Sequence, residues 1–180
     1  LLVPVGLWER PTGAGATWRI PEPDVDRFVD YLFEEYRVAL MWLDPARWQS
    51  WSAAWAERHG EKVVVDKPFS DRFWRDLTDL WDSTLRTTIA RLAADEPPGS
   101  EHSICHTGDP DLTRHIGNAR RERIGGRVGA ARGWKPAKKS DTRKKDLVDA
   151  SMLALAARAH ALEHGLLVGD AEGEPGNQIW

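Results

Sequence analysis

Short, wholly apolar runs alternate with segments of helical periodicity along this 180-residue chain. The run VALMWL, residues 38–43, is apolar at every position and too short for a core helix, so we predict a strand buried on both faces. KVVVD, residues 62–66, predicts a second strand. Apolar residues recur at helical spacing in residues 24–36, 70–94 and 146–164, which predicts three amphipathic helices. This interleaving predicts an α/β fold whose sheet is at least partly parallel.

The segment DPARWQSWSAAWAERHG, residues 44–60, predicts a further helix directly after the first buried strand. Asp44 is placed to cap its N-terminus, Pro45 lies in its first turn, and Gly60 is the expected stop signal. Three of its aromatic side chains fall on one helical face, which favours a core stripe over a platform for stacking bases. These residues are Trp48, Trp51 and Trp55.

Three less regular stretches complete the expected elements. LLVPVGLWE, residues 1–9, predicts a strand in which Pro4 requires an edge position or a bulge. SICH, residues 103–106, predicts a short strand, and DPDLTRHIGNARR, residues 109–121, a short helix. The Gly-rich stretch at residues 123–145 has no helical period, which predicts a loop or a loose hairpin.

Basic residues are concentrated in one segment of the chain. Between Arg120 and Lys145, eleven Lys and Arg stand against two acids, a local charge of +9, whereas the remainder of the chain carries −12. The net charge of −3 conceals this segregation. A basic segment in an otherwise acidic protein attracts a polyanion locally, which favours contacts to a nucleic-acid backbone. A mobile basic loop without a ligand is the alternative interpretation.

Length and composition indicate one globular domain at residues 1–165, followed by a flexible C-terminal tail at 166–180. No apolar run approaches the roughly 20 residues of a membrane span, so we expect no membrane association. The N-terminus has neither the basic region nor the cleavage site of a secretory signal peptide. The chain begins Leu1-Leu2-Val3 without Met, from which we expect it to be a piece of something longer.

The single cysteine, Cys105, excludes an internal disulfide and fits a reducing compartment. Together with His106 and His115 it could coordinate zinc. Neighbouring residues on a strand point to opposite faces, however, and this disfavours a zinc site. His115 and Asn118 lie three apart on a predicted helix, which indicates capping, hydrogen bonds to loop backbone, or contact with a phosphate.

Two carboxylates lie where the fold could bring them together. Asp44 ends the buried strand, and ligands in open α/β sheets collect beyond the carboxyl ends of strands. Asp149 lies in the first turns of the last predicted helix and could point toward Asp44. Converging carboxylates bind Mg²⁺ or Mn²⁺, and two such ions can catalyse phosphodiester hydrolysis. The alternatives are that Asp44 only caps its helix, that Asp149 is a solvated first-turn acid, and that Asp146 is either a spare ligand or an N-cap.

Four stretches in this order resemble the C-terminal nuclease domain of the large terminase subunit of tailed bacteriophages. PVGLWERPTGAGATWRIPEPDV is similar to the second strand of that family and its following turn. YRVALMWLDPARWQ resembles the strand that ends in a metal-binding Asp. HTGDPDLTRHIGNARR, a basic stretch and then KKDLVDASMLALAARA resemble the run into the last metal-binding Asp. The resemblance implies a ribonuclease H-like mixed sheet flanked by helices, N-terminally truncated because the first strand and its Asp are missing.

The resemblance also implies a function and a set of partners. It implies a metal-dependent endonuclease of double-stranded DNA in the host cytoplasm, with the small terminase subunit and the portal as partners and two Mg²⁺ or Mn²⁺ ions. No GxxxxGK[ST] loop occurs in these residues, so we expect no ATP site. The alternatives are a catalytically inactive nucleic-acid-binding fragment of the same fold and a fragment with no independent role. The resemblance implies Asp44 and Asp149 as metal ligands, and Asp146 is a further candidate. The expected phosphate contacts are Arg120, Arg121, Arg123, Arg127, Arg132, Lys135, Lys138 and Lys139.

Overall fold

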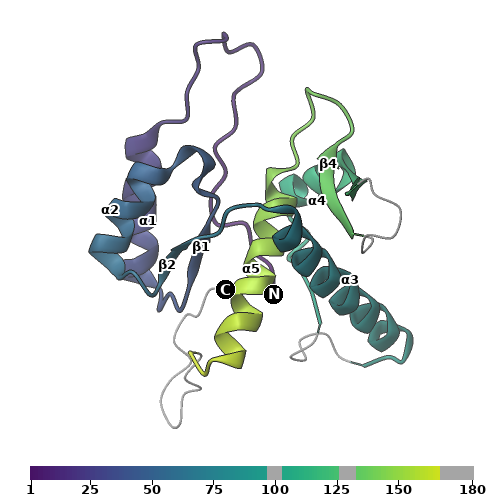
Figure 1. Ribbon diagram of the computed structural model, residues 1–180. Coiled ribbons are helices and arrows are strands. Elements are labelled where there is room, and N and C mark those ends of the chain that lie inside the picture. The colour runs from purple at the N-terminus through teal and green to yellow at the C-terminus, as the bar shows by residue number, and fades with distance from the viewer. Residues whose placement is uncertain (97–102, 126–132, 167–180) are drawn as a thin grey trace.

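The computed structural model describes residues 1–96, 103–125 and 133–166 and has a mixed α/β architecture (Figure 1). Its described part contains five α-helices and two small two-stranded sheets, one parallel and one antiparallel. The α/β prediction is therefore confirmed at the level of fold class. Residues 167–180, which make up nearly all of the predicted tail, lie outside the described residues.

The parallel sheet is formed by the last three residues of each strand predicted from the apolar runs. β1 (Met41–Leu43) pairs with β2 (Val64–Asp66) in a register that places Met41 opposite Val64. All three residues of β1 are partly exposed, so the prediction of a strand buried on both faces is wrong. The helices α1 (Glu22–Glu35) and α2 (Gln49–His59) pack against this pair. Their shared core is formed by the buried side chains of Val29, Trp55 and Val64.

The predicted helix at residues 44–60 is divided into two parts. Pro45–Arg47 forms a short 3₁₀ turn, and α2 begins only after Trp48, whose φ of −124° lies outside the helical range. Gly60 ends α2 with a positive φ of 109°, in agreement with the predicted stop. The aromatic stripe is a core stripe, as predicted, because Trp55 is buried and Trp48 and Trp51 pack beside it.

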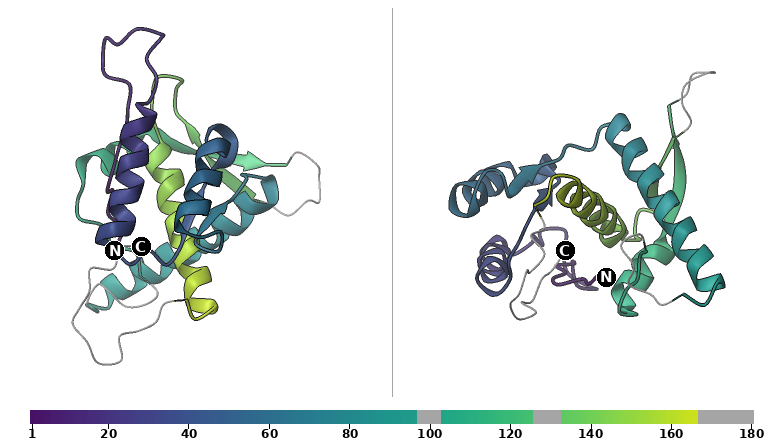
Figure 2. Two further views of the ribbon diagram at one scale, coloured as in Figure 1. Left: turned by 90° about the vertical axis from the view of Figure 1, so that its left-hand side faces the viewer. Right: turned by 90° about the horizontal axis from the view of Figure 1, so that it is seen from below.

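The last helix, α5 (Asp146–Glu163), lies at the centre of the molecule, between α1 and α2 on one side and α3 (Asp71–Ala93) on the other (Figures 1 and 2). It is buried on more faces than the single predicted stripe, because it also packs against α3 and β1. Met152 is 1% exposed and is joined in the core by Trp74, Leu77 and Ile124. Two residues of the predicted helical stripes are instead exposed, Leu92 and Leu162, because each lies near the C-terminal end of its helix.

The basic segment begins as a regular antiparallel hairpin. After α4 (Pro110–Asn118), β3 (Ala119–Ile124) pairs along its whole length with β4 (Gly133–Lys138). The hairpin alternative of the sequence prediction is therefore correct for these strands. The helix expected over residues 109–121 ends three residues early, because the chain turns extended at Ala119.

The two outer strands predicted from the sequence do not form. Residues 1–9 and 103–106 contribute a single parallel bridge between Leu2 and His106, together with a backbone hydrogen bond of 2.7 Å from Leu2 N–H to the Cys105 carbonyl. Pro4 has no N–H with which to continue this ladder, and the N-terminal segment instead runs along α1 and α5. None of the helices in the described ranges is both long and apolar enough to cross a membrane.

Candidate metal and nucleic-acid site

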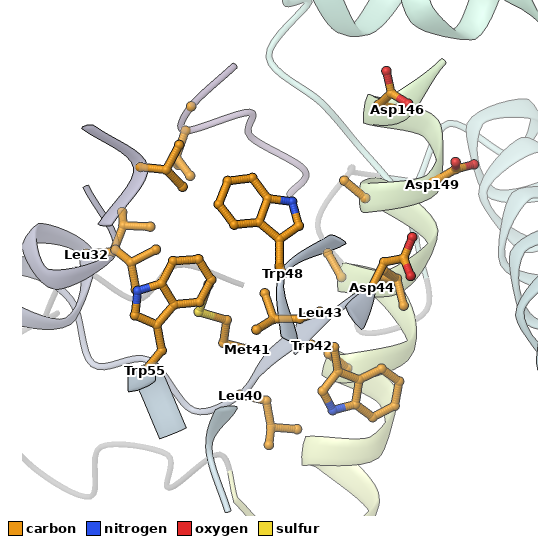
Figure 3. A pocket seen from close by; sticks show the side chains of 18 of the residues that line it. Leu32, Leu40, Met41, Trp42, Leu43, Asp44, Trp48, Trp55, Asp146 and Asp149 are labelled. Carbon is orange, nitrogen blue, oxygen red and sulfur yellow. The ribbon is translucent and has the colours of Figure 1, made fainter. Parts of the chain in front are cut away.

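An apolar pocket with an acidic rim lies between the N-terminal segment, α1, β1 and α5 (Figure 3). Its volume is about 530 Å³, and its walls are mainly aliphatic and aromatic. Asp44 from the end of β1 and Asp146 and Asp149 from the first turns of α5 also line it. Segments distant in the sequence thus bring the three candidate acids to one pocket.

Asp44 directly follows β1 and is exposed. Its Oδ1 accepts a hydrogen bond of 3.1 Å from the Ala46 N–H, which caps the short 3₁₀ turn. The capping alternative predicted for Asp44 is therefore confirmed, although the capped element is a 3₁₀ turn and not a long helix. Capping uses one carboxylate oxygen, and among the described residues no hydrogen bond or ion pair engages Oδ2.

Asp149 is held in a largely desolvated position by its neighbour one helical turn earlier. Its Oδ2 forms an ion pair with the Lys145 ammonium, and the two side chains are only 19% and 13% exposed. Its other oxygen, Oδ1, is buried and has no hydrogen-bond partner in the described part of the chain. The interpretation of Asp149 as a solvated first-turn acid is therefore wrong, because α3 and β1 pack around this part of α5.

The pKa of Asp149 is raised above its ordinary value of 3.8. Burial is the largest cause, and the negative charges of Asp146 and Asp44 add to it, while the ion pair with Lys145 opposes the shift. Of these causes, the charge of Asp44 is the smallest. A cation held between the acids would offset the repulsion among them.

Asp146 lies beside this pair but does not have the alternative role predicted for it. It is the first residue of α5 and is exposed, while the N-cap position belongs to Lys145, so the prediction that Asp146 is the N-cap is wrong. No side-chain oxygen caps this helix from its own N-cap residue. Within residues 1–96, 103–125 and 133–166, no three His, Cys, Asp or Glu side chains converge to hold one ion.

The raised pKa of Asp149 predicts a measurable pH dependence of folding. Because the folded-state pKa exceeds 3.8, proton binding at Asp149 stabilises the fold; this contribution is complete below pH 3.8 and is lost as the pH rises through the folded-state pKa. Asp149→Asn removes the titration. We therefore expect the stability of this variant, relative to the metal-free wild type, to increase from acidic to neutral pH in urea unfolding with a chelator present. A difference independent of pH would contradict this expectation.

The start of α5 is fixed by a buried histidine instead of a conventional cap. His115 is 0% exposed, and its Nδ1 accepts a hydrogen bond of 3.0 Å from the Leu147 N–H. Its Nε2 therefore carries the proton and donates to Glu9 Oε1 at 2.8 Å. Asn118 donates to the Lys144 carbonyl at 2.9 Å, so both capping and backbone-bonding roles predicted for this residue pair are confirmed.

Glu9 is a structural partner that no pattern in the sequence indicated, since it lies 106 residues from His115. Burial tends to raise its pKa, but hydrogen bonds from Arg114 and His115 outweigh this effect and hold the pKa below its ordinary value of 4.5. Arg114 Nη2 lies 2.8 Å from Glu9 Oε2. This contact joins the N-terminal segment to α4, and through His115 to the first turn of α5.

Several basic side chains of the hairpin are already engaged within the fold. Arg121 pairs with Asp82 at 2.9 Å and stacks over the Trp134 ring at 4.4 Å. Lys139 donates to the Gly117 carbonyl at 2.7 Å. These contacts attach the hairpin to α3 and α4, so they give the side chains a structural role.

Two further basic side chains are engaged, and two others are available to a ligand. Arg120 and Lys135 share the single acid of β3, Glu122, at 3.3 and 3.6 Å, and Arg120 Nε donates to the Lys138 carbonyl at 3.1 Å. Arg123 and Lys138 are exposed and form no ion pair within the described part of the chain. Two of the predicted phosphate contacts, Arg127 and Arg132, lie outside the described residues.

Comparison with known proteins identifies no relative of this chain. No family model, no curated protein and no solved structure matches it. The properties that bear on function are therefore those of the chain itself, namely an acidic rim on an apolar pocket and a basic hairpin that leads directly into the helix bearing Asp149.

Proposed function

We propose that this chain is the nuclease part of a phage DNA-packaging terminase, with a ribonuclease H-like fold, and that it cleaves double-stranded DNA with divalent cations. The observation that carries the proposal is the buried Oδ1 of Asp149, which has no hydrogen-bond partner among the described residues and belongs to a side chain that lines the same pocket as Asp44. A buried carboxylate oxygen without a donor costs free energy that the fold must offset elsewhere. A bound cation that contacts this oxygen would remove the cost, so an oxygen of this kind is expected at a ligand site.

The donor set fits Mg²⁺ or Mn²⁺ by its chemistry. Both ions prefer oxygen ligands, keep several water molecules, and are commonly bound by one or two carboxylates. Asp44 Oδ2 and Asp149 Oδ1 would hold the ion, with Asp146 reaching it through water. When bound, such ions activate water for attack on a phosphodiester and stabilise the leaving oxygen.

The chain's own residues would position the DNA against this rim. The hairpin β3–β4 presents basic side chains, and residues 139–145 connect it directly to the first turn of α5. Asn118 fixes this connection through the Lys144 carbonyl. A phosphate backbone bound along the hairpin would therefore be directed toward the helix terminus that carries Asp146 and Asp149. The small terminase subunit and the portal remain proposed partners from the family resemblance.

The engaged and free basic residues predict different effects on DNA binding. Replacing Arg123 and Lys138 together by Gln should weaken DNA binding about equally for all sequences and reduce the slope of log affinity against log salt by about 2, one per phosphate contact. Arg121→Gln should instead lower the melting temperature, because it breaks the Asp82 pair and the Trp134 stack. Fluorescence anisotropy at several salt concentrations measures the first effect, and thermal unfolding the second. A salt slope unchanged in the double variant would contradict the phosphate-contact role.

A second candidate function is DNA binding without cleavage. It is favoured by the exposed side chains of Arg123 and Lys138 on the hairpin, because basic groups of this kind bind a phosphate backbone without a metal. The two functions are separated by incubating supercoiled plasmid with the protein and Mn²⁺, with and without a chelator. Chelator-sensitive nicking supports the nuclease, whereas salt-dependent binding without nicking supports the binding module.

A further inference from the structure

We propose that the Lys145 ammonium is a built-in competitor of the metal, occupying Asp149 in the metal-free protein and lowering its affinity for divalent cations. This inference rests on the proposed metal site and concerns the regulation of that site. It assigns Lys145 a positioning role, because the residue acts on the metal through Asp149. The i, i+4 spacing of Lys145 and Asp149 places both on one face at the start of α5.

The contacts of Lys145 place its charge at the carboxylate. Its Nζ forms an ion pair with Asp149 Oδ2 and lies 5.8 Å from the centre of the Trp74 ring. Among the described residues this ion pair is the only one that Lys145 makes. The carboxylate thus has one oxygen occupied by a monovalent cation and one that is buried and unpartnered.

The Lys145 ammonium and a divalent cation would compete for the Asp149 carboxylate because both are positively charged. An ammonium and a divalent ion on one carboxylate repel each other, and a largely buried pair is screened less by salt than a surface pair. A metal at Asp149 must therefore displace the ammonium or bind against its charge, and either process weakens binding. Because the lysine stem is flexible, the ammonium can move to a phosphate as DNA reaches the rim. Metal binding would then be favoured when the substrate is present.

The test is a Mn²⁺ titration followed by electron paramagnetic resonance on the full chain and three variants. In Lys145→Gln we expect Mn²⁺ to bind about tenfold tighter than in the wild type, since a nearby positive charge is removed. Lys145→Arg keeps the charge and should bind as the wild type does. Lys144→Gln removes the same charge one residue away and is the matched control, because Lys144 forms no ion pair among the described residues.

The outcomes separate this inference from the proposed function. If the wild type binds Mn²⁺ through Asp44 and Asp149 but Lys145→Gln binds no more tightly, the competitor role is overturned and the metal site stands. If neither protein binds Mn²⁺, the proposed function fails, and the inference fails with it. A purely structural role for Lys145 would lower the thermal stability of Lys145→Gln without changing its Mn²⁺ affinity.

A measurement on the wild type covers the case in which Lys145→Gln does not fold. The ammonium resonance of Lys145 is expected to be observable by ¹⁵N nuclear magnetic resonance, because its ion pair protects it from solvent exchange. On saturation with diamagnetic Mg²⁺ we expect this resonance to shift or to disappear as the ion pair opens. A resonance unchanged at Mg²⁺ saturation would overturn the proposal.

Discussion

Asp149→Asn is expected to reduce Mn²⁺-dependent cleavage of plasmid DNA by roughly a hundredfold or more. Mutating even the residues that hydrogen-bond to metal ligands lowers metal affinity or activity by about 10- to 100-fold, and loss of a ligand should cost at least as much. The substitution removes the anionic oxygen that is buried and unpartnered in the metal-free protein. An amide at this position offers a neutral oxygen and adds two donors that repel a cation. The measurement is the rate of conversion of supercoiled to nicked plasmid at fixed Mn²⁺.

Asp44→Asn should cause a loss of the same order while leaving the fold intact. Asn is as good an N-cap as Asp, so the hydrogen bond from the Ala46 N–H is retained. This variant therefore separates the capping role of Asp44 from its role as a ligand. Asp141→Asn, an exposed acid in the segment that precedes α5, is the control and should cleave at the wild-type rate. Full activity in both Asp44→Asn and Asp149→Asn would contradict the assigned site.

His115→Ala is expected to lower the free energy of unfolding by about 3 kcal/mol, a large effect for one residue. The substitution leaves the Leu147 N–H without its acceptor at the start of α5 and removes the partner of Glu9 Oε1. It also opens a cavity, because His115 is fully buried. Urea unfolding at neutral pH, followed by tryptophan fluorescence, measures the change.

The matched control for this prediction is His106→Ala. His106 is exposed, and within the described residues its side chain accepts only a short-range hydrogen bond of 3.0 Å from the Gly108 N–H, so its loss should cost under about 1 kcal/mol. Equal destabilisation of the two variants would show that His115 does not hold the N-terminal segment and α5 together.

The helices and the parallel strand pair were predictable because their signals are local. The apolar period of residues 24–36 and 70–94 produces amphipathic helices, and that of residues 146–164 also predicts a helix, although α5 is buried on several faces. Likewise, an apolar run ending at Asp44-Pro45 marks both the end of β1 and the turn that follows. The Lys145–Asp149 ion pair could also have been predicted from its i, i+4 spacing, although the predicted site did not include Lys145.

Contacts between distant segments were not predictable from these patterns. The strand β3, with the sequence ARRERI, has no apolar alternation, and its register is set by pairing with β4. The N-terminal residues were expected to form a strand, but they make a single bridge, at Leu2, and are also held by long-range side-chain contacts such as Glu9 with His115. Similarly, the desolvation of Asp149 arises from α3 and β1 packing around α5, which the helical period of α5 does not encode.

The most direct test of the account is a crystal structure with Mn²⁺, using the anomalous scattering of the metal to locate it. We expect an ion within about 2.5 Å of Asp149 Oδ1 and of an Asp44 oxygen, with the Lys145 ammonium moved away from Asp149. An anomalous map with no peak at the acidic rim under saturating Mn²⁺, and Asp149 still paired with Lys145, would contradict it.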